Sequence, residues 1–195
     1  MRWKDLKIGE DDTIIYCKKK NMPLAIETEG LHPSSELCLQ ALQWLHEQRD
    51  FRNVLDMGCG NGILSAVAAS VWDAKVLAVD ISEKAIADAE QNIAAYELTE
   101  RVTPLRSDGF SAPEISRRAP YDLILCNMLA EFTVETARRL KTCLAPDGIC
   151  ILAGILAWKA EPVEMTYSAL GFETIKEFTN SPWRAYIMRS IVTKP

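Results

Sequence analysis

The sequence predicts an α/β fold, a doubly wound and mostly parallel sheet with helices on both faces. From Arg52 onward, short β-branched and apolar runs alternate with segments of helical periodicity. The expected strand Ile149–Ala153 is nearly all apolar, as strands are when helices cover both faces of a sheet. A glycine-rich turn, Asp56–Gly62, follows the first of the expected strands. In such folds, ligands bind at the carboxyl ends of the strands.

Seven strands are expected in this sheet. The last two form a hairpin, so one strand near the C-terminus runs antiparallel to the others. In chain order, the expected strands are Arg52–Asp56, Lys75–Asp80, Arg101–Arg106, Tyr121–Cys126, Ile149–Ala153, Phe172–Phe178 and Arg184–Ser190. The expected helices are Ile63–Trp72, one that Ser82 caps, Leu129–Leu144 (closed by the turn Ala145–Gly148) and one near Glu161–Leu170 that stops at Gly171.

Before this alternating region, the sequence predicts an N-terminal extension over residues 1–50, packed on a core of residues 51–195 within a single domain. It comprises a hairpin of Thr13–Lys19 with Leu24–Thr28, then a helix from about Pro33 to Gln48. The basic run Lys18–Lys20 is interpreted as a solvated hairpin tip, with a phosphate or acidic-partner contact as the alternative.

Composition excludes several classes of function. The net charge of -5 argues against a chain that holds nucleic acid through its global field. The six cysteines form no Cys-x-x-Cys pair, so no metal site or disulfide framework is expected and the thiols should be buried. No signal peptide and no membrane-spanning run is visible, which favours a cytoplasmic location. The sequence does not indicate an oligomeric state.

The glycine-rich turn is the first candidate ligand site. Its glycines let the backbone approach a ligand closely, and the helix that follows offers free N–H groups. Ile63 stands where a dinucleotide-binding turn has its third glycine. Asp56, ahead of Gly58 and Gly60, would repel a pyrophosphate. Its carboxylate can instead accept bonds, directly or through water, from the ammonium-bearing methionyl end of S-adenosylmethionine.

Polar residues at three further strand ends extend this site. Asp80, followed by Ile81, ends the second strand, where an acid commonly accepts bonds from ribose hydroxyls. Asp108 and Gly109 follow the third strand; they form either a simple Asp-Gly turn or an acceptor for the adenine amine with flanks for the ring. Asn127 closes the fourth strand at the same edge. The ordered set predicts a nucleoside site for S-adenosylmethionine, with S-adenosylhomocysteine as the product.

At these residues the chain resembles class I methyltransferases of the PrmA type, which have a Rossmann-like fold. The motifs are VLDMGCGNGILS, AVDIS and DLILCNMLAEF, together with LHPSSELCLQALQWL and a late Trp183. The resemblance extends from about Glu27 to the end, with Thr28-Glu29-Gly30 where the family has Gly-Thr-Gly. The family N-methylates a protein of the large ribosomal subunit, and its separate N-terminal substrate-holding domain has no counterpart here. The resemblance implies cofactor contacts for Ser35, Gly58, Asp80 and Asn127.

The expected chemistry is in-line methyl transfer, which depends chiefly on orientation and the exclusion of water. Asn127 is the first candidate to orient an acceptor amine, through its side-chain carbonyl. His32 is either a second catalytic residue or a loop or capping histidine, and Glu131 is either an acid–base group or a favourable charge at a helix start. The tryptophans Trp44, Trp72 and Trp158 are expected to pack, while Trp183 could flank a substrate pocket.

Three classes of function follow from these patterns. The first is N-methylation of an amine on a protein or peptide. A small-molecule N- or O-methyltransferase is the alternative within the same chemistry. Two alternatives have a different chemistry: a non-catalytic S-adenosylmethionine-binding module and a nucleotide-binding oxidoreductase. The missing third glycine argues against the oxidoreductase. A nucleic-acid methyltransferase would carry Asn-Pro-Pro or Asp-Pro-Pro at Asn127, and Met128 and Leu129 stand there instead.

Overall fold

The computed structural model describes residues 14–17, 22–25 and 31–191 of the chain. Its main strands are β3 (Asn53–Met57), β4 (Lys75–Asp80), β5 (Val102–Arg106), β6 (Tyr121–Asn127), β7 (Leu144–Leu156), β8 (Phe172–Asn180) and β9 (Trp183–Ser190). Its helices are α1 (Pro33–His46), α2 (Ile63–Trp72), α3 (Glu83–Ala95), α4 (Pro113–Arg118), α5 (Ala130–Cys143) and α6 (Ala160–Ala169), with short 3-10 turns η3 (Gly109–Ser111) and η4 (Ala157–Lys159).

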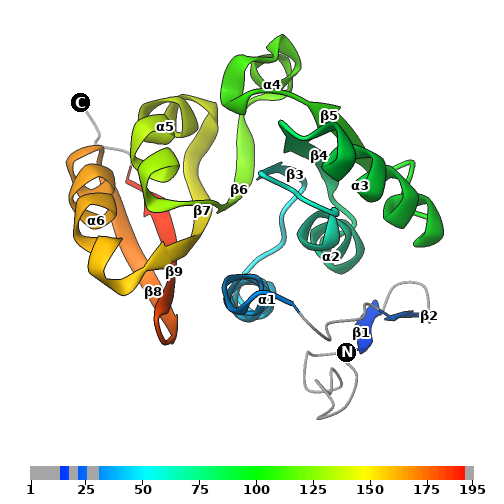
Figure 1. Cartoon of the computed structure of the whole chain (residues 1–195), viewed down its shortest axis with the longest axis horizontal. Coiled ribbons are helices and arrows are strands. Elements are labelled where there is room, and N and C mark those ends of the chain that lie inside the picture. Colours follow the sequence, from blue (N-terminus) through cyan, green and yellow to red (C-terminus); the bar gives the residue numbers. More distant parts are fainter. Residues whose placement is uncertain (1–13, 18–21, 26–30, 192–195) are drawn as a thin grey trace.

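The strands form one seven-stranded sheet in the order β5-β4-β3-β6-β7-β9-β8 (Figure 1). β9 runs antiparallel to both of its neighbours, and the pairings among β3 to β7 are parallel. The predicted class, strand count and single antiparallel strand are therefore confirmed. The chain leaves β3 toward β4 on one side and later adds β6 on the other. This reversal is the switch point at which open α/β sheets bind ligands.

Side chains alternate between the two faces of the sheet, and each face has its own core. Leu123 and Leu125 of β6 belong to the cluster that includes residues of α1, α2 and α3. Ile124 and Cys126, one position along, belong to the cluster that includes residues of α4, α5 and α6. The period of two places successive side chains on opposite faces, so the apolar residues of this central strand pack against both helix layers.

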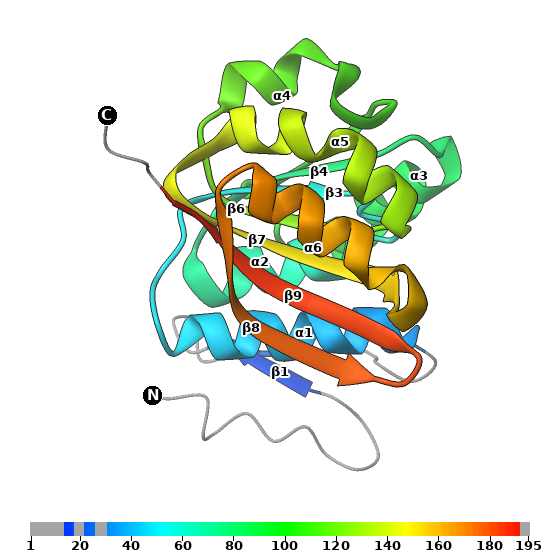
Figure 2. The ribbon, with the colours of Figure 1, turned by 90° about the vertical axis from the view of Figure 1, so that its left-hand side faces the viewer.

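The N-terminal helix α1 covers the end of the sheet that carries the hairpin. It lies against β7, β8 and β9, as Figure 2 shows. Ahead of it, β1 (Ile14–Cys17) and β2 (Met22–Ala25) pair antiparallel, so a hairpin is present, and its second strand begins two residues earlier than predicted. The basic run of residues 18–20 and the segment 28–30 lie outside the described residues.

Strand β7 is longer than the sequence predicts. Leu144, expected to end the preceding helix, begins the strand, and the predicted turn Ala145–Gly148 lies inside it. The backbone does turn there, since Asp147 has a φ of 55°. The chain pairs with β6 on both sides of this turn, with a shift in register after Tyr121. The Pro-Asp-Gly segment is thus an irregularity within a paired strand and not a separate loop. The short helix α4 was also not predicted.

The cysteines and tryptophans test the predicted core. Five cysteines are free and buried, as expected for small hydrophobic side chains, and burial raises the pKa of Cys126 to about 12. Trp72 is buried, but Trp158 is 70% exposed, so the expectation that it packs in the core is wrong. Its position in η4 places it on the surface, outside both clusters. Among the described helices, none is long and apolar enough to cross a membrane.

Candidate active site

The glycine-rich turn joins β3 to α2 at the switch point of the sheet. Gly58, Gly60 and Gly62 have φ values of 74°, 54° and 79°, a left-handed backbone that glycine adopts without strain. A Cβ on Gly58 would lie 2.1 Å from Sδ of Met128, whereas a Cβ on Gly60 would meet nothing within 4 Å. Gly58 is therefore pressed against the end of β6, and Gly60 faces open space where a ligand can approach the backbone.

This difference gives a prediction for two alanine variants. Gly60→Ala should lower the free energy of unfolding by about 1–2 kcal/mol, the cost of a left-handed residue with a side chain. Gly58→Ala should cost more, since Met128 must also move. Urea unfolding measures both, and in a Met128→Ala background the excess for Gly58→Ala should disappear. An equal loss in all backgrounds would contradict the observed contact.

Asp80 ties the turn to the next helix. Its Oδ2 accepts a hydrogen bond from the N–H of Gly60 at 3.0 Å, and its Oδ1 accepts one from the N–H of Ser82 at 2.9 Å. The Ser82 hydroxyl in turn caps α3 by accepting from the N–H of Ala85 at 3.2 Å, as predicted. Two backbone donors thus hold this carboxylate in one orientation. Each oxygen retains a second lone pair for a ligand hydroxyl.

Asp56 lies on the other side of the turn and is only 1% exposed. Its Oδ2 accepts a 2.6 Å hydrogen bond from the Ser65 hydroxyl of α2, and its Oδ1 has no partner among the described residues. Burial raises the pKa of this carboxyl from 3.8 to about 6, against the lowering effect of the Ser65 bonds, and the charge of Asp80 adds to the rise. The sequence predicts that Asp56 binds the methionyl end either directly or through water. The side chain has too little exposed surface for the direct contact.

The raised pKa of Asp56 predicts how stability depends on pH. The folded chain holds this proton more tightly than the unfolded chain, so the stabilisation is fully present below pH 3.8 and is lost as the pH rises through about 6. The loss should be roughly 2–3 kcal/mol. Urea unfolding at several pH values should show a flatter profile for Asp56→Asn, which becomes the more stable protein at neutral pH. Parallel profiles for the two proteins would contradict this.

A pocket of about 160 Å³ opens beside the turn, between the ends of β3, β4, β5 and β6. It brings together five of the residues that the sequence singled out. These are Gly58, Asp80, Ile81, Asp108 and Gly109. The pocket is lined mainly by apolar atoms and carries one carboxylate at each of two strand ends. That combination suits a flat heteroaromatic ring joined to a hydroxylated sugar.

Sequence reasoning missed the part of this lining that comes from the end of β6 and from α5. Met128 and Phe132 form the wall that β6 and α5 contribute, and Met57, Val79 and Ser107 complete the lining. The Ser107 hydroxyl accepts from the N–H of Ala112 and donates to the carbonyl of Gly109, both at 3.0 Å, so it shapes the turn. The two interpretations of Asp108 are therefore compatible, since one residue belongs to the turn and lines the pocket.

Asn127 ends β6 next to this pocket, and its amide is held from α1. Its Nδ2 donates to the hydroxyl of Ser35 at 3.1 Å. Its Oδ1 is buried with no partner among the described residues. Gly154 of β7 leaves room there, since a Cβ on it would lie 3.1 Å from that oxygen. An unpartnered buried acceptor costs free energy, and an N–H or water that binds there would recover it.

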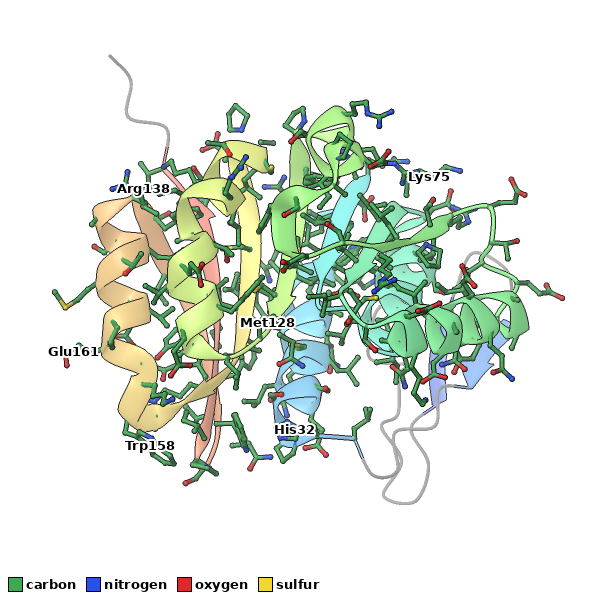
Figure 3. The ribbon with its side chains drawn as sticks, turned by 45° about the horizontal axis from the view of Figure 1, so that its top comes forward. His32, Lys75, Met128, Arg138, Trp158 and Glu161 are labelled. Carbon is green, nitrogen blue, oxygen red and sulfur yellow. The ribbon has the colours of Figure 1, made fainter. Side chains whose placement is uncertain are left out.

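His32 and Trp183 meet at the N-terminus of α1. The rings are 4.6 Å apart in an edge-to-face arrangement. Nδ1 of His32 accepts from the N–H of Ser34 at 3.3 Å and shares a 2.8 Å hydrogen bond with its hydroxyl. The geometry thus shows the capping arrangement that was one of the two expectations. Figure 3 places His32 at the same end of the molecule as Trp158, opposite Lys75 and Arg138.

Glu131 forms an ion pair with Lys159, which links the first turn of α5 to η4. The hydrogen bond from Lys159 lowers the pKa of this carboxyl, followed by a backbone hydrogen bond of its own. A carboxylate held in the charged form is a weak base at neutral pH. The geometry favours a structural part for Glu131 over the acid–base part.

The pocket at the switch point and the seven-stranded sheet with one reversed strand define a Rossmann-like methyltransferase fold. A crystal structure of a ribosomal protein L11 methylase from Lactobacillus delbrueckii superposes with a TM-score of 0.73 over 83% of this chain and 81% of that one, at 24% identity. An RNA methyltransferase from Salinibacter ruber, solved with S-adenosyl-L-homocysteine, superposes with a TM-score of 0.64 over 85% of this chain and 97% of that one, at 14% identity.

The chain belongs to the ribosomal protein L11 methyltransferase (PrmA) family, whose model matches residues 23–190. It is similar to the ribosomal protein L11 methyltransferase of Bradyrhizobium diazoefficiens, with 32% identity over 83% of this chain and 55% of the relative. The enzyme of that name from Heliobacterium modesticaldum is 31% identical over 96% of this chain and 56% of the relative. The chain thus spans about half the length of these relatives.

Proposed function

We propose that this chain is an S-adenosylmethionine-dependent methyltransferase that transfers the methyl group to an amine of a protein or peptide. The observation that carries this proposal is the juxtaposition of two features at one edge of the sheet. One is the apolar pocket bordered by the Asp80 carboxylate, and the other is the buried, unpartnered Oδ1 of Asn127. The first suits a nucleoside and the second suits an N–H donor.

The residues present fit the methyl donor in three places. The apolar walls from Met128 and Phe132 suit the adenine ring, and Asp80 suits the ribose hydroxyls. The open backbone at Gly60 suits the methionyl end, which leaves Asp56 to act on it through charge or a water. When bound there, S-adenosylmethionine supplies a methyl group already activated by its sulfonium charge.

The protein's own part is to place the amine and to exclude water. Oδ1 of Asn127 accepts a hydrogen bond from the neutral amine, which turns the nitrogen lone pair toward the methyl group. Ser35 occupies the NH₂ group of this amide and leaves the oxygen as the atom without a partner. An acceptor ammonium must give one proton to water before attack, so that the neutral nitrogen carries a free lone pair.

A labelled donor tests the class of acceptor. We expect that incubation of the chain with radiolabelled S-adenosylmethionine and a cell extract places the label in the protein fraction, in acid-stable form. Asn127→Ala should label that fraction about 100-fold more slowly. Label confined to the small-molecule fraction would favour the alternative acceptor class. Tight donor binding with no label in either fraction would favour a non-catalytic binding module.

A further inference from the structure

A second hollow lies outside the nucleoside pocket, between the first turns of α5 and α6. Its volume is about 450 Å³. We call it the α5–η4 groove and define it by its lining, which is Ala130, Glu131, Val134, Glu135, Trp158, Lys159 and Pro162. Trp158, one of the lining residues, is 70% exposed. An exposed tryptophan that does not pack in the core can bury its apolar surface against a binding partner.

The groove begins a few residues along the chain from the methyl-transfer end of the proposed site. Asn127 is followed directly by Met128 of the nucleoside pocket, and Ala130 of the groove comes two residues later. The opposite wall follows β7, whose residue Ala153 pairs with Asn127. The groove therefore opens at the carboxyl edge of the sheet, on the same edge as the orienting amide.

The charged residues that line the groove are Glu131, Glu135 and Lys159, so its lining carries one excess negative charge. The ion pair of Lys159 with Glu131 joins η4 to α5 and neutralises the cation of the lining. Glu135 is exposed and has no ion-pair partner within the described part of the chain. Glu161, at the start of α6, is exposed on the outer side of that helix (Figure 3) and does not line the groove. An apolar hollow with a negative lining complements a cationic polypeptide that presents an apolar side chain.

We propose that the α5–η4 groove binds an apolar side chain of the polypeptide that carries the acceptor amine. Trp158 is the contact wall, and Glu135 faces the positive charge of the polypeptide. The proposal rests on the proposed function and assigns it a specificity site. The volume suits one aromatic or large aliphatic side chain, and exposed tryptophans commonly dominate such contacts. A symmetric pairing of two copies through this face would set the lining carboxylates against each other.

Lysine peptides with a movable phenylalanine test this groove. Each peptide has one central lysine in a glycine background, blocked ends, and phenylalanine at a different position on either side; a reference peptide has none. Calorimetry in the presence of S-adenosylhomocysteine gives their affinities, and turnover gives kcat/KM. At least one phenylalanine position should strengthen binding about tenfold over the reference.

Two variants locate the effect. Trp158→Ala should remove the tenfold gain while S-adenosylhomocysteine affinity stays unchanged. Met165→Ala is the matched control, because Met165 of the adjoining helix α6 is 65% exposed and does not line the groove. This control should keep the full gain.

No gain at any phenylalanine position, or a gain that survives Trp158→Ala, would overturn the groove proposal and leave donor binding and methyl transfer intact. Dimers in sedimentation that depend on Trp158 would overturn it in favour of a second copy. Failure of the unmodified chain to bind S-adenosylhomocysteine would instead overturn the proposed function, and this proposal with it.

Discussion

Asp80→Ala should reduce the affinity for S-adenosylmethionine at least 100-fold in calorimetry. The described pocket lining contains two carboxylates, Asp80 and Asp108. Asp80 is the less exposed of the two and is our candidate for binding both ribose hydroxyls. Hydrogen bonds to a charged group contribute about 1.5–3 kcal/mol each, so the loss of two exceeds 3 kcal/mol. The variant also releases the N–H groups of Gly60 and Ser82, which loosens the turn that the methionyl end needs.

A matched control separates charge from site. Asp88→Ala removes an exposed carboxylate from α3, where it pairs only with Lys84, and should leave donor affinity unchanged. Circular dichroism and urea unfolding establish that both variants fold. Equal binding of NADH by the unmodified chain, or wild-type donor affinity in Asp80→Ala, would remove the ribose assignment.

Asn127→Ala should lower turnover about 100-fold while donor affinity falls much less. An orienting acceptor acts on the amine in the transition state, and loss of one such group typically costs 10²–10³ in rate. Single-turnover kinetics with saturating donor measures the chemical step directly. Unchanged turnover would exclude Asn127 from the mechanism.

Substitutions at Ser35 refine this result. Ser35→Ala removes the hydroxyl that accepts from Nδ2 of Asn127, so the amide can rotate and turnover should fall by a smaller factor, about 10-fold. Ser35→Thr keeps the hydroxyl and should restore most of the rate. Loss of donor binding in Ser35→Ala with an unchanged chemical step would assign the hydroxyl to the donor instead.

The features that sequence alone predicted are those set by local chemistry. The turn at Gly58 and Gly60, the Ser82 cap and the strand ends at Asp80 and Asn127 each follow from residues close in the chain. The order of the strands was not among these predictions, because it depends on which strands pair across the sheet. Contact between these ends is a property of all parallel sheets, so the candidate site needed no tertiary detail.

The features that sequence missed depend on contacts between distant segments. Met128 reaches Gly58 across the switch point, and no local pattern indicates that contact. Asp56 has the spacing of a ligand-facing acid, but Ser65 of the next helix covers it. Trp158 has a large apolar side chain of the kind usually found in a core, but the position of η4 leaves it on the surface. Burial of a side chain depends on what packs over it, which spacing does not encode.

The two backbone bonds that Asp80 accepts link elements that are separate in the chain. A further bond, from Nδ2 of Asn92 in α3 to the carbonyl of Asn61 at 2.9 Å, fastens the helix to the same turn. The turn and α3 should therefore open to solvent as one unit, because breaking the carboxylate's contacts frees both. Deuterium uptake at the amides of Gly60 and Ser82 should slow together when a nucleoside engages the carboxylate, which makes α3 a remote reporter of occupancy.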